Sequence, residues 1–326
     1  MKKVIVWFRN DLRIRDNETL FRACGDGNQI LPVYILDERL LTSTELDFQR
    51  AGSLRLQFLL ESLADLKKSL QLLGADLIIR IGNPAEILSS MAEELKVDII
   101  HYSKEVAHEE QTDIQRLEQK DLGKGILLNG FWQSTLIHED DVPWPVKQVP
   151  DVFTRFRKES EKTVQVHDEY PAPQQINYQE EIDSGKIPSL DDLRVETQAR
   201  SKKSVLDFKG GESAAWERLH SYFWEDDLLK SYKYTRNELI GKNYSSKFSP
   251  WLALGCISPK CIYFEIKRYE KERVKNSSTY WLFFELLWRD FFKFMTKKHG
   301  KSIFFTTGIT GESVRMKDDL QAFERW

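Results

Sequence analysis

Short apolar segments alternate with amphipathic helical segments over the first 130 residues of this chain. Five of the apolar segments are typical of buried strands, namely residues 4–8, 30–36, 76–81, 98–102 and 126–129. Between the second and third of these, leucine and phenylalanine recur at helical spacing over residues 54–73, and Gly74 follows as a stop signal. Two further helices are predicted after Asn83-Pro84 and near His108. Such alternation predicts a parallel, doubly wound α/β sheet whose ligands bind beyond the carboxyl ends of its strands.

Two common nucleotide-binding fingerprints are missing from the sequence. A dinucleotide fold usually carries G-x-G-x-x-G after its first strand, but residues 8–13 read Phe-Arg-Asn-Asp-Leu-Arg. A phosphate-binding P-loop is also absent from the sequence. Nicotinamide enzymes and P-loop NTPases are therefore disfavoured.

The pattern changes twice farther along the chain. Residues 131–210 contain six prolines and many charged residues, which predicts a long irregular connector that marks a domain boundary and wraps over the second domain. From residue 211 onward the strand pattern disappears and only helical segments are expected: 212–220, 260–272 and 279–299. We predict an α/β domain (1–130), a connector (131–210) and an all-helical domain (211–326).

Composition narrows the class of protein. Hydrophobic residues make up 41% and charged residues 30% of the 326 residues, and no stretch approaches the ~20 apolar residues of a membrane span. Cys24, Cys256 and Cys261 show neither disulfide nor zinc-site spacing, so a reducing compartment and no metal are expected. The formal net charge of −3 confines any nucleic-acid surface to a local patch. We expect a soluble, cytoplasmic monomer without a membrane partner.

A serine-rich segment at 245–249 is the first candidate for chemistry. Ser245, Ser246 and Ser249 precede the apolar run 251–255, and hydroxyls with first-turn amides can bind an anion. Residues 230–251 contain five basic residues and one acidic residue, a net charge of 5 − 1 = +4, and aromatic residues are interleaved with them. This combination fits a phosphate-binding surface with stacking faces. An ordinary helix N-cap and a solvated charged face are the alternatives.

The second candidate is an aromatic helix at 281–294, which holds seven aromatic residues. Glu285, Trp288, Arg289 and Phe292 recur along one side of it. A simple i,i+4 ion pair between Glu285 and Arg289 is one explanation. Because charges within an apolar wall cost several kcal/mol unless they are paired or bound to a polar ligand, a large, flat, partly charged cofactor is the other.

Three segments together identify a resemblance. The segments Tyr232-x-x-x-Arg236-Asn237, 245–255 and 284–292 closely resemble the photolyase/cryptochrome flavoproteins, specifically the cryptochrome DASH branch, and the opening segment 7–13 agrees. The resemblance runs over the whole chain. It implies an antenna-binding α/β domain and a helical FAD domain. It also implies blue-light-driven electron transfer from reduced FAD to cyclobutane pyrimidine dimers in DNA, preferably single-stranded.

The resemblance also assigns roles to residues. The positions that match the segment holding the FAD phosphates and ribityl chain are Tyr232, Ser245, Ser246, Lys247, Phe248 and Ser249. Glu285 and Arg289 match positions beside the flavin and the lesion pocket. Trp288 matches the aromatic on which the flipped lesion stacks, so Glu285 and Trp288 are the predicted catalytic residues. Arg236 matches a contact to the DNA backbone.

In the first domain, residues 105–110 resemble the segment that binds a 5,10-methenyltetrahydrofolate antenna. A carboxylate suits the paired donors of a pterin ring, which selects Glu109 and Glu110. The alternative is the acidic first turn of a helix, which the helix dipole favours.

Two departures from the family bear on function. The family continues beyond residue 326, and residues 320–326 end within an apparent helix, so we expect a fragment that holds FAD weakly or not at all. Met316 stands where the family usually has the outer tryptophan of an electron-hopping chain, which predicts slow flavin photoreduction. A signalling photoreceptor without repair and an inactive remnant are the alternative functions.

Overall fold

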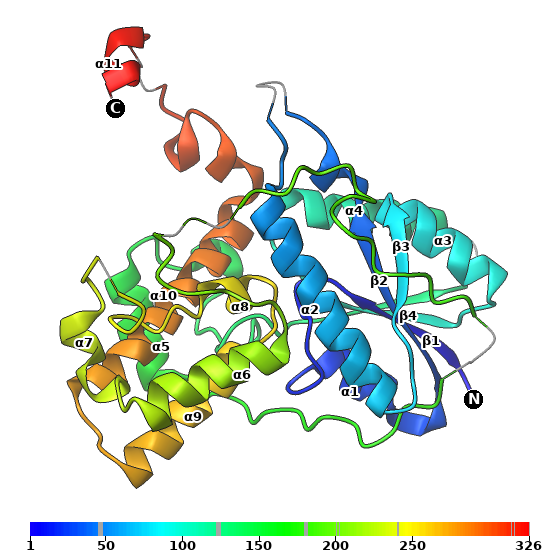
Figure 1. Ribbon diagram of the computed structural model, residues 1–326, viewed down its shortest axis with the longest axis horizontal. Coiled ribbons are helices and arrows are strands. Elements are labelled where there is room, and N and C mark those ends of the chain that lie inside the picture. The colour runs from blue at the N-terminus through cyan, green and yellow to red at the C-terminus, as the bar shows by residue number, and fades with distance from the viewer. Residues whose placement is uncertain are drawn as a thin grey trace.

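The computed structural model describes residues 1–44, 48–121, 125–178, 182–199, 201, 203–239, 241–313, 315 and 317–325. Five parallel strands form one sheet in the order β3-β2-β1-β4-β5. The strands are β1 (Lys3–Phe8), β2 (Gln29–Asp37), β3 (Ile78–Gly82), β4 (Ile99–Ser103) and β5 (Leu127–Phe131). The predicted parallel α/β domain followed by a helical region is confirmed (Figure 1).

Eleven α-helices occur among the described residues. They are α1 (Glu18–Ala23), α2 (Ser53–Leu72), α3 (Pro84–Glu94), α4 (His108–Asp121), α5 (Phe153–Thr163), α6 (Glu212–His220), α7 (Tyr232–Thr235), α8 (Ser249–Ala253), α9 (Pro259–Glu272), α10 (Ser277–His299) and α11 (Leu320–Arg325). Local signals explain the boundaries: the Asn83 side chain accepts from two amides at the start of α3, and Gly74 has φ +83° just after α2.

Apolar side chains on the two faces of the sheet enter different cores. On one face, Ile5, Ile35 and Ile100 pack with Leu88 of α3 and Leu117 of α4. On the other face, the buried cluster that begins with the strands continues through α2 into the helical region and reaches α10. The two regions therefore share one hydrophobic core, which fixes the position of one relative to the other.

The connector contacts both regions. Two described parts of it, residues 176–178 and 182–184, lie beside the sheet: the Ile30 amide donates to the Asn177 carbonyl and the Ile79 amide to the Ser184 carbonyl, both at 2.8 Å. Helix α5, in contrast, packs on α10. The sequence predicted wrapping over the second domain, where α5 lies; the backbone hydrogen bonds to the sheet edge are an additional contact that the sequence did not indicate (Figure 1).

A close approach of two backbones joins the domains. Gly255 has φ +64°, and a Cβ there would overlap the backbone oxygen of Asn10. Nearby, the buried Arg13 donates to the Gly255 carbonyl at 2.9 Å. Only glycine combines this left-handed conformation with so little space.

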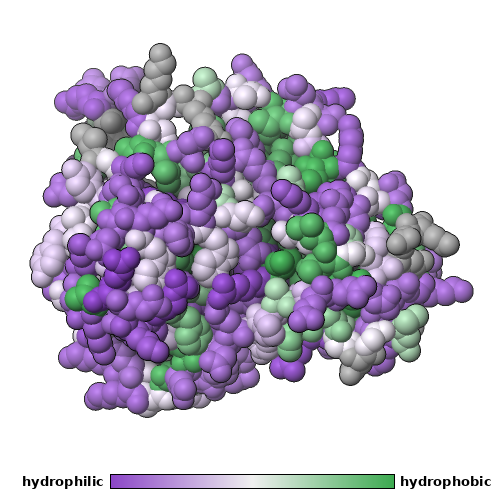
Figure 2. All heavy atoms as spheres, turned by 60° about the horizontal axis from the view of Figure 1, so that its bottom comes forward, coloured by the Kyte–Doolittle hydropathy of each residue, from purple (hydrophilic) through white to green (hydrophobic). Residues whose placement is uncertain are grey.

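One face of the molecule is mostly polar (Figure 2). In the view of Figure 2, hydrophilic side chains dominate and apolar side chains gather in separate small areas. None of the helices in the described part of the chain is long and apolar enough to cross a membrane.

Candidate cofactor-binding site

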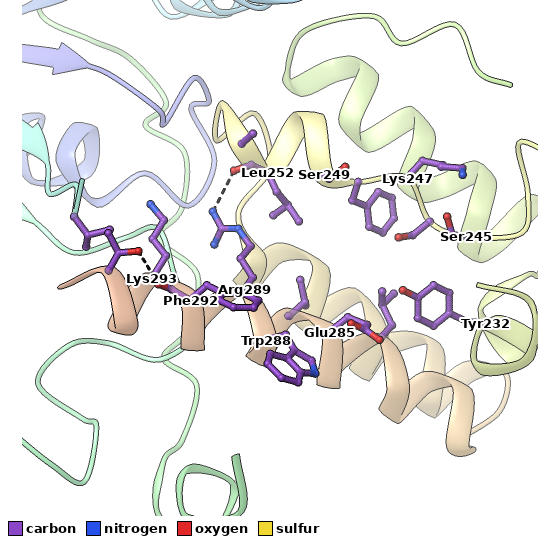
Figure 3. A pocket seen from close by; sticks show the side chains of 17 residues that line it. Tyr232, Ser245, Lys247, Ser249, Leu252, Glu285, Trp288, Arg289, Phe292 and Lys293 are labelled. Atoms are coloured by element: carbon purple, nitrogen blue, oxygen red, sulfur yellow. Dashed lines mark hydrogen bonds between the residues drawn. The ribbon is translucent and has the colours of Figure 1, made fainter. Parts of the chain in front are cut away.

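A cavity of about 820 Å³ lies between α10 and the segment that leads into α8 (Figure 3). Its lining includes nine of the residues selected from the sequence: Tyr232, Ser245, Ser246, Lys247, Phe248, Ser249, Glu285, Trp288 and Arg289. Apolar residues Val106, Leu252, Leu282, Leu286 and Phe292 complete much of the wall. Two segments about 40 residues apart in sequence thus form one site, and its volume is in the upper part of the ~300–1,000 Å³ range of small-molecule pockets.

The 245–249 segment presents backbone amides as well as hydroxyls. Lys247 has φ +60° and Phe248 has φ −73° and ψ −12°, so a left-handed residue is followed by a right-handed one. Successive residues of opposite hand direct their N–H groups into one concavity, a nest that binds anions. Among the described residues, the amides of Lys247 and Phe248 have no protein acceptor. The segment is therefore suited to an anionic group such as a phosphate.

The alternative of an ordinary serine N-cap is wrong for this segment. Helix α8 begins at Ser249, its N-cap position is Phe248, and no side chain caps it. With five residues it is also too short for its dipole to hold an anion alone. The nest, rather than the helix, is the feature that fits phosphate.

The proposed Glu285–Arg289 ion pair is not formed. Glu285 instead accepts from Arg236 Nε at 3.2 Å and from the Trp281 indole at 3.1 Å. Arg289 donates to the backbone carbonyls of Ser134 and of Leu252, the latter at 3.2 Å. Glu285 and Arg289 therefore bind different partners instead of each other.

Through these two hydrogen bonds, Arg289 connects α10 to the connector and to α8. Figure 3 shows its side chain reaching from α10 toward Leu252. Burial lowers the pKa of this guanidinium, and the neighbouring Asp290 and Glu105 oppose that effect. Its contacts with neutral carbonyls leave it as a local positive charge in the cavity wall.

The two residues selected for DNA contacts are partly engaged within the protein. The Trp288 ring stacks on Phe153 of α5, with 3.6 Å between centroids and 16° between planes, and on Phe292 at 5.5 Å. Arg236 does not line the cavity; besides Glu285, it donates to the Lys233 carbonyl at 2.6 Å. One face of Trp288 is thus occupied by Phe153.

A second cavity of about 330 Å³ adjoins the first. Val106 lines both cavities, and Lys293 of the first pairs with Glu105 of the second at 2.8 Å. Among its other lining residues are Glu118 and Trp132. The segment 105–110 therefore contributes to this cavity through its first two residues.

Glu109 and Glu110 lie elsewhere. Both border a cavity of about 150 Å³ near the carboxyl ends of β1 and β2, and Glu109 pairs with Arg50 at 2.7 Å on the surface. The side chains selected for the antenna thus do not line the second cavity. They occupy the first turn of α4, as the helix-dipole alternative expects.

Two remaining expectations concern metal and Met316. In the ranges that the structure describes, no group of three or more His, Cys, Asp or Glu side chains is arranged to hold a metal ion. Met316 lies outside the described residues. Two residues of the site were missed in the sequence. Lys293 lines the cavity, and its position one helical turn beyond Arg289 could have indicated this. Arg218 contacts the 245–249 segment from the side away from the cavity.

Comparison with known proteins places the chain in a family. The family model described as DNA photolyase matches residues 4–174. A cryptochrome DASH of Gloeobacter violaceus is 43% identical over 325 residues, covering 100% of this chain and 65% of that protein. A cryptochrome DASH of Natronomonas pharaonis is 40% identical over 326 residues, covering 100% of this chain and 69% of that protein.

A solved structure agrees. The crystal structure of a Synechocystis sp. PCC6803 cryptochrome superposes with a TM-score of 0.94 and 42% identity, covering 99% of this chain and 67% of that chain. The chain thus spans about two thirds of the length of these relatives. Because the family model matches over half of the chain and the relatives agree along all of it, this chain belongs to the DNA photolyase family, in its cryptochrome DASH branch.

Proposed function

We propose that the 820 Å³ cavity binds FAD and that the protein uses blue light to split cyclobutane pyrimidine dimers in single-stranded DNA. The observation that carries the proposal is the joining of the amide nest and the aromatic helix in one cavity. A dinucleotide with a flat ring system needs both an anion site and an apolar slot. The family membership supports the same cofactor.

The residues present fit the parts of that cofactor. The nest at Lys247 and Phe248, with the hydroxyls of Ser245 and Ser249, would hold the pyrophosphate. Leu282 and Leu286 offer an apolar surface to a flat ring, and Arg289 holds a positive charge at the inner end. A reduced flavin held by these residues would supply, on excitation, an electron to the dimer, and the electron would return to the flavin once the dimer has opened.

Substrate binding would rely on the outer part of the site. Trp288 presents an aromatic ring whose inner face is backed by Phe153, which keeps it rigid as a stacking platform for an unpaired base. Arg236 pairs with Glu285, one helical turn before Trp288 on α10, and keeps its orientation through this carboxylate. We infer that DNA binding would require Arg236 to share or exchange this carboxylate.

For the antenna, we propose a folate in the second cavity. Glu118 and Glu105 there offer carboxylates to a pterin, as Glu109 and Glu110 were predicted to do, and Trp132 offers an aromatic face. The shared residue Val106 places this cavity directly beside the first. Glu109 and Glu110, which border a different cavity, stay a prediction for the antenna site.

A signalling photoreceptor that binds FAD without repair is the second candidate. The engagement of Arg236 by Glu285 and of one Trp288 face by Phe153 favours it, because both groups serve the protein before any DNA arrives. All three cysteines are free, which suits a reducing compartment such as the cytoplasm for either function.

The test begins with flavin titration of the purified 326-residue chain. FAD should bind weakly but saturably, with loss of flavin fluorescence, and riboflavin, which lacks the pyrophosphate, should bind at least about tenfold more weakly. Blue light should then restore thymines in a dimer-containing single-stranded oligonucleotide. Flavin binding without restored thymines would favour the photoreceptor. Absence of flavin binding would overturn both candidates and favour the inactive remnant.

A further inference from the structure

A buried arginine lies directly behind the 245–249 segment, on the side away from the cavity. Arg218, near the end of α6, is 7% exposed and is not part of the cavity lining. Its guanidinium donates to four oxygens of one short stretch: Ser246 O at 3.0 Å, Lys242 O at 2.9 Å, Ser245 O at 3.1 Å and Asn243 Oδ1 at 3.4 Å. One side chain therefore organises the whole approach to the nest.

These contacts determine which way the amides face. The carbonyls of Ser245 and Ser246 both point toward Arg218. In a planar trans peptide, the carbonyl and the following N–H point in opposite directions. The amides of Ser246 and Lys247 therefore point away from Arg218, toward the cavity that these residues line. The left-handed Lys247 then adds the Phe248 amide to the same concavity.

The charge of Arg218 is not cancelled by a carboxylate. All four acceptors are neutral, and within the described residues Arg218 forms no ion pair. The carboxylate of Asp226 accepts from the Asn243 amide at 3.3 Å and acts on Arg218 only at longer range, where it opposes the lowering of the Arg218 pKa by burial. The positive charge thus stands behind the nest, where it favours an anion on the other side.

The other end of α6 is anchored in the first domain. Glu212, in the first turn, is buried and accepts the amides of Ile14 at 2.7 Å and Arg15 at 3.3 Å. Arg218 also lies over the Tyr222 ring at 5.0 Å. The arginine is therefore presented by a fixed helix rather than by a mobile one.

We propose that Arg218 is the positioning residue of the phosphate subsite: by donating hydrogen bonds to the carbonyls of Lys242, Ser245 and Ser246, it keeps the nest amides directed toward the cavity. The identity of the ligand rests on the proposed function, whereas the hold on the loop does not. Arg218 acts through the backbone and touches no ligand itself.

The test compares R218A and R218K with a matched control, R157A. Arg157 is half-buried, pairs with Glu161 at 2.8 Å and, like Arg218, lies over an aromatic ring, but it is on α5, away from the loop. The first readout is tryptic cleavage after Lys242 and Lys247 in ligand-free protein, which reports local opening. R218A should raise the cleavage rate at these two sites by at least about tenfold, since several hydrogen bonds are lost. R157A should not.

The second readout is the ratio of FAD to riboflavin affinity. R218A should lose FAD affinity by at least about tenfold while riboflavin affinity stays within about twofold, and millimolar guanidinium should restore part of the loss. R218K should be intermediate, because an ammonium reaches fewer of the four acceptors.

The outcomes separate the two proposals. Unchanged cleavage at Lys242 and Lys247 in R218A, or equal losses for FAD and riboflavin, would overturn the role of Arg218. If the unmodified protein binds neither flavin, the proposed function fails, and the cleavage pattern alone then decides the positioning role.

Discussion

Asp290 is a fully buried carboxylate on α10 that joins the helix to the connector. Its two oxygens accept the amides of Leu136 at 3.2 Å and Ile137 at 2.9 Å. Burial raises its pKa from 3.8 to about 7, although these amides and the neighbouring Arg289 and Lys293 favour the charged form. We predict that Asp290→Asn removes a large part of the pH dependence of folding.

The sign follows from the raised pKa. Because the folded state binds this proton more tightly than the unfolded state does, the contribution of Asp290 to the free energy of unfolding is fully present below about pH 4. It is lost as the pH rises through about 7. A shift of about three units at about 1.4 kcal/mol per unit sets about 4 kcal/mol as the upper limit. Between about pH 5 and about pH 8, the wild-type protein should lose about 2–3 kcal/mol through this group.

Asparagine has nearly the same shape but does not titrate. Its single oxygen can accept one of the two amides, while its NH₂ group faces the other donor, so the variant should be less stable at low pH by about 1–3 kcal/mol. The difference between the proteins should shrink or reverse by about pH 8, where the wild type must bury a charge.

Urea unfolding followed by tryptophan fluorescence at several pH values measures both proteins. Comparison of the two isolates Asp290 from Asp11 and Glu212, whose pKa values burial also raises, to about 6 and about 7. Parallel pH profiles for the wild type and the variant would refute the reasoning, because Asp290 would then titrate alike in the folded and unfolded states.

Two further predictions concern the interior. Gly255→Ala should lower the free energy of unfolding by about 3 kcal/mol or more, because the new Cβ would meet the backbone of Asn10 at a residue in the left-handed conformation. Gly52→Ala is the control and should be nearly neutral, because Gly52 has φ −70° and open space around it. Similar urea midpoints for the two variants would contradict this prediction. Trp288→Ala should lower the free energy of unfolding by about 2–3 kcal/mol, because the stack on Phe153 is lost. Phe292→Ala is the control: Phe292 is 59% exposed, so its loss should change the free energy of unfolding by about 0.5 kcal/mol or less. Equal losses in urea unfolding would show that the stack contributes little.

Local sequence signals predicted the elements well. The five apolar runs became the five strands, and Gly74, Asn83 and Pro84 bounded helices as expected. These signals act within a few residues, so no distant contact is needed to interpret them. The path of the connector was predicted less well, because its hydrogen bonds to the sheet edge join residues more than 100 positions apart.

The candidate site was partly accessible from sequence. The residue types at 245–249 and 281–294 suggested an anion site and an aromatic wall, and the cavity brings them together. The partners of Glu285 and Arg289 were not predictable. The i,i+4 spacing permits an ion pair between them, but it cannot show that Arg236 lies close enough to Glu285 to form the pair instead, or that Arg289 donates to backbone carbonyls. Nor did the pattern distinguish serine hydroxyls from the backbone nest, which depends on the sign of φ at Lys247.

Sequence alone determined the succession of strands and helices along the chain, the family, and the two segments that supply the polar groups of the cavity. Apolar periodicity and motifs are properties of neighbouring residues, so they can be recognised without the tertiary structure. Only the tertiary structure decided which charges meet: Arg236 with Glu285, Arg289 with two carbonyls, and Arg218 behind the nest. A buried charge takes whichever partner the packing of distant segments brings within about 3 Å, and that choice cannot be derived from spacing along the chain.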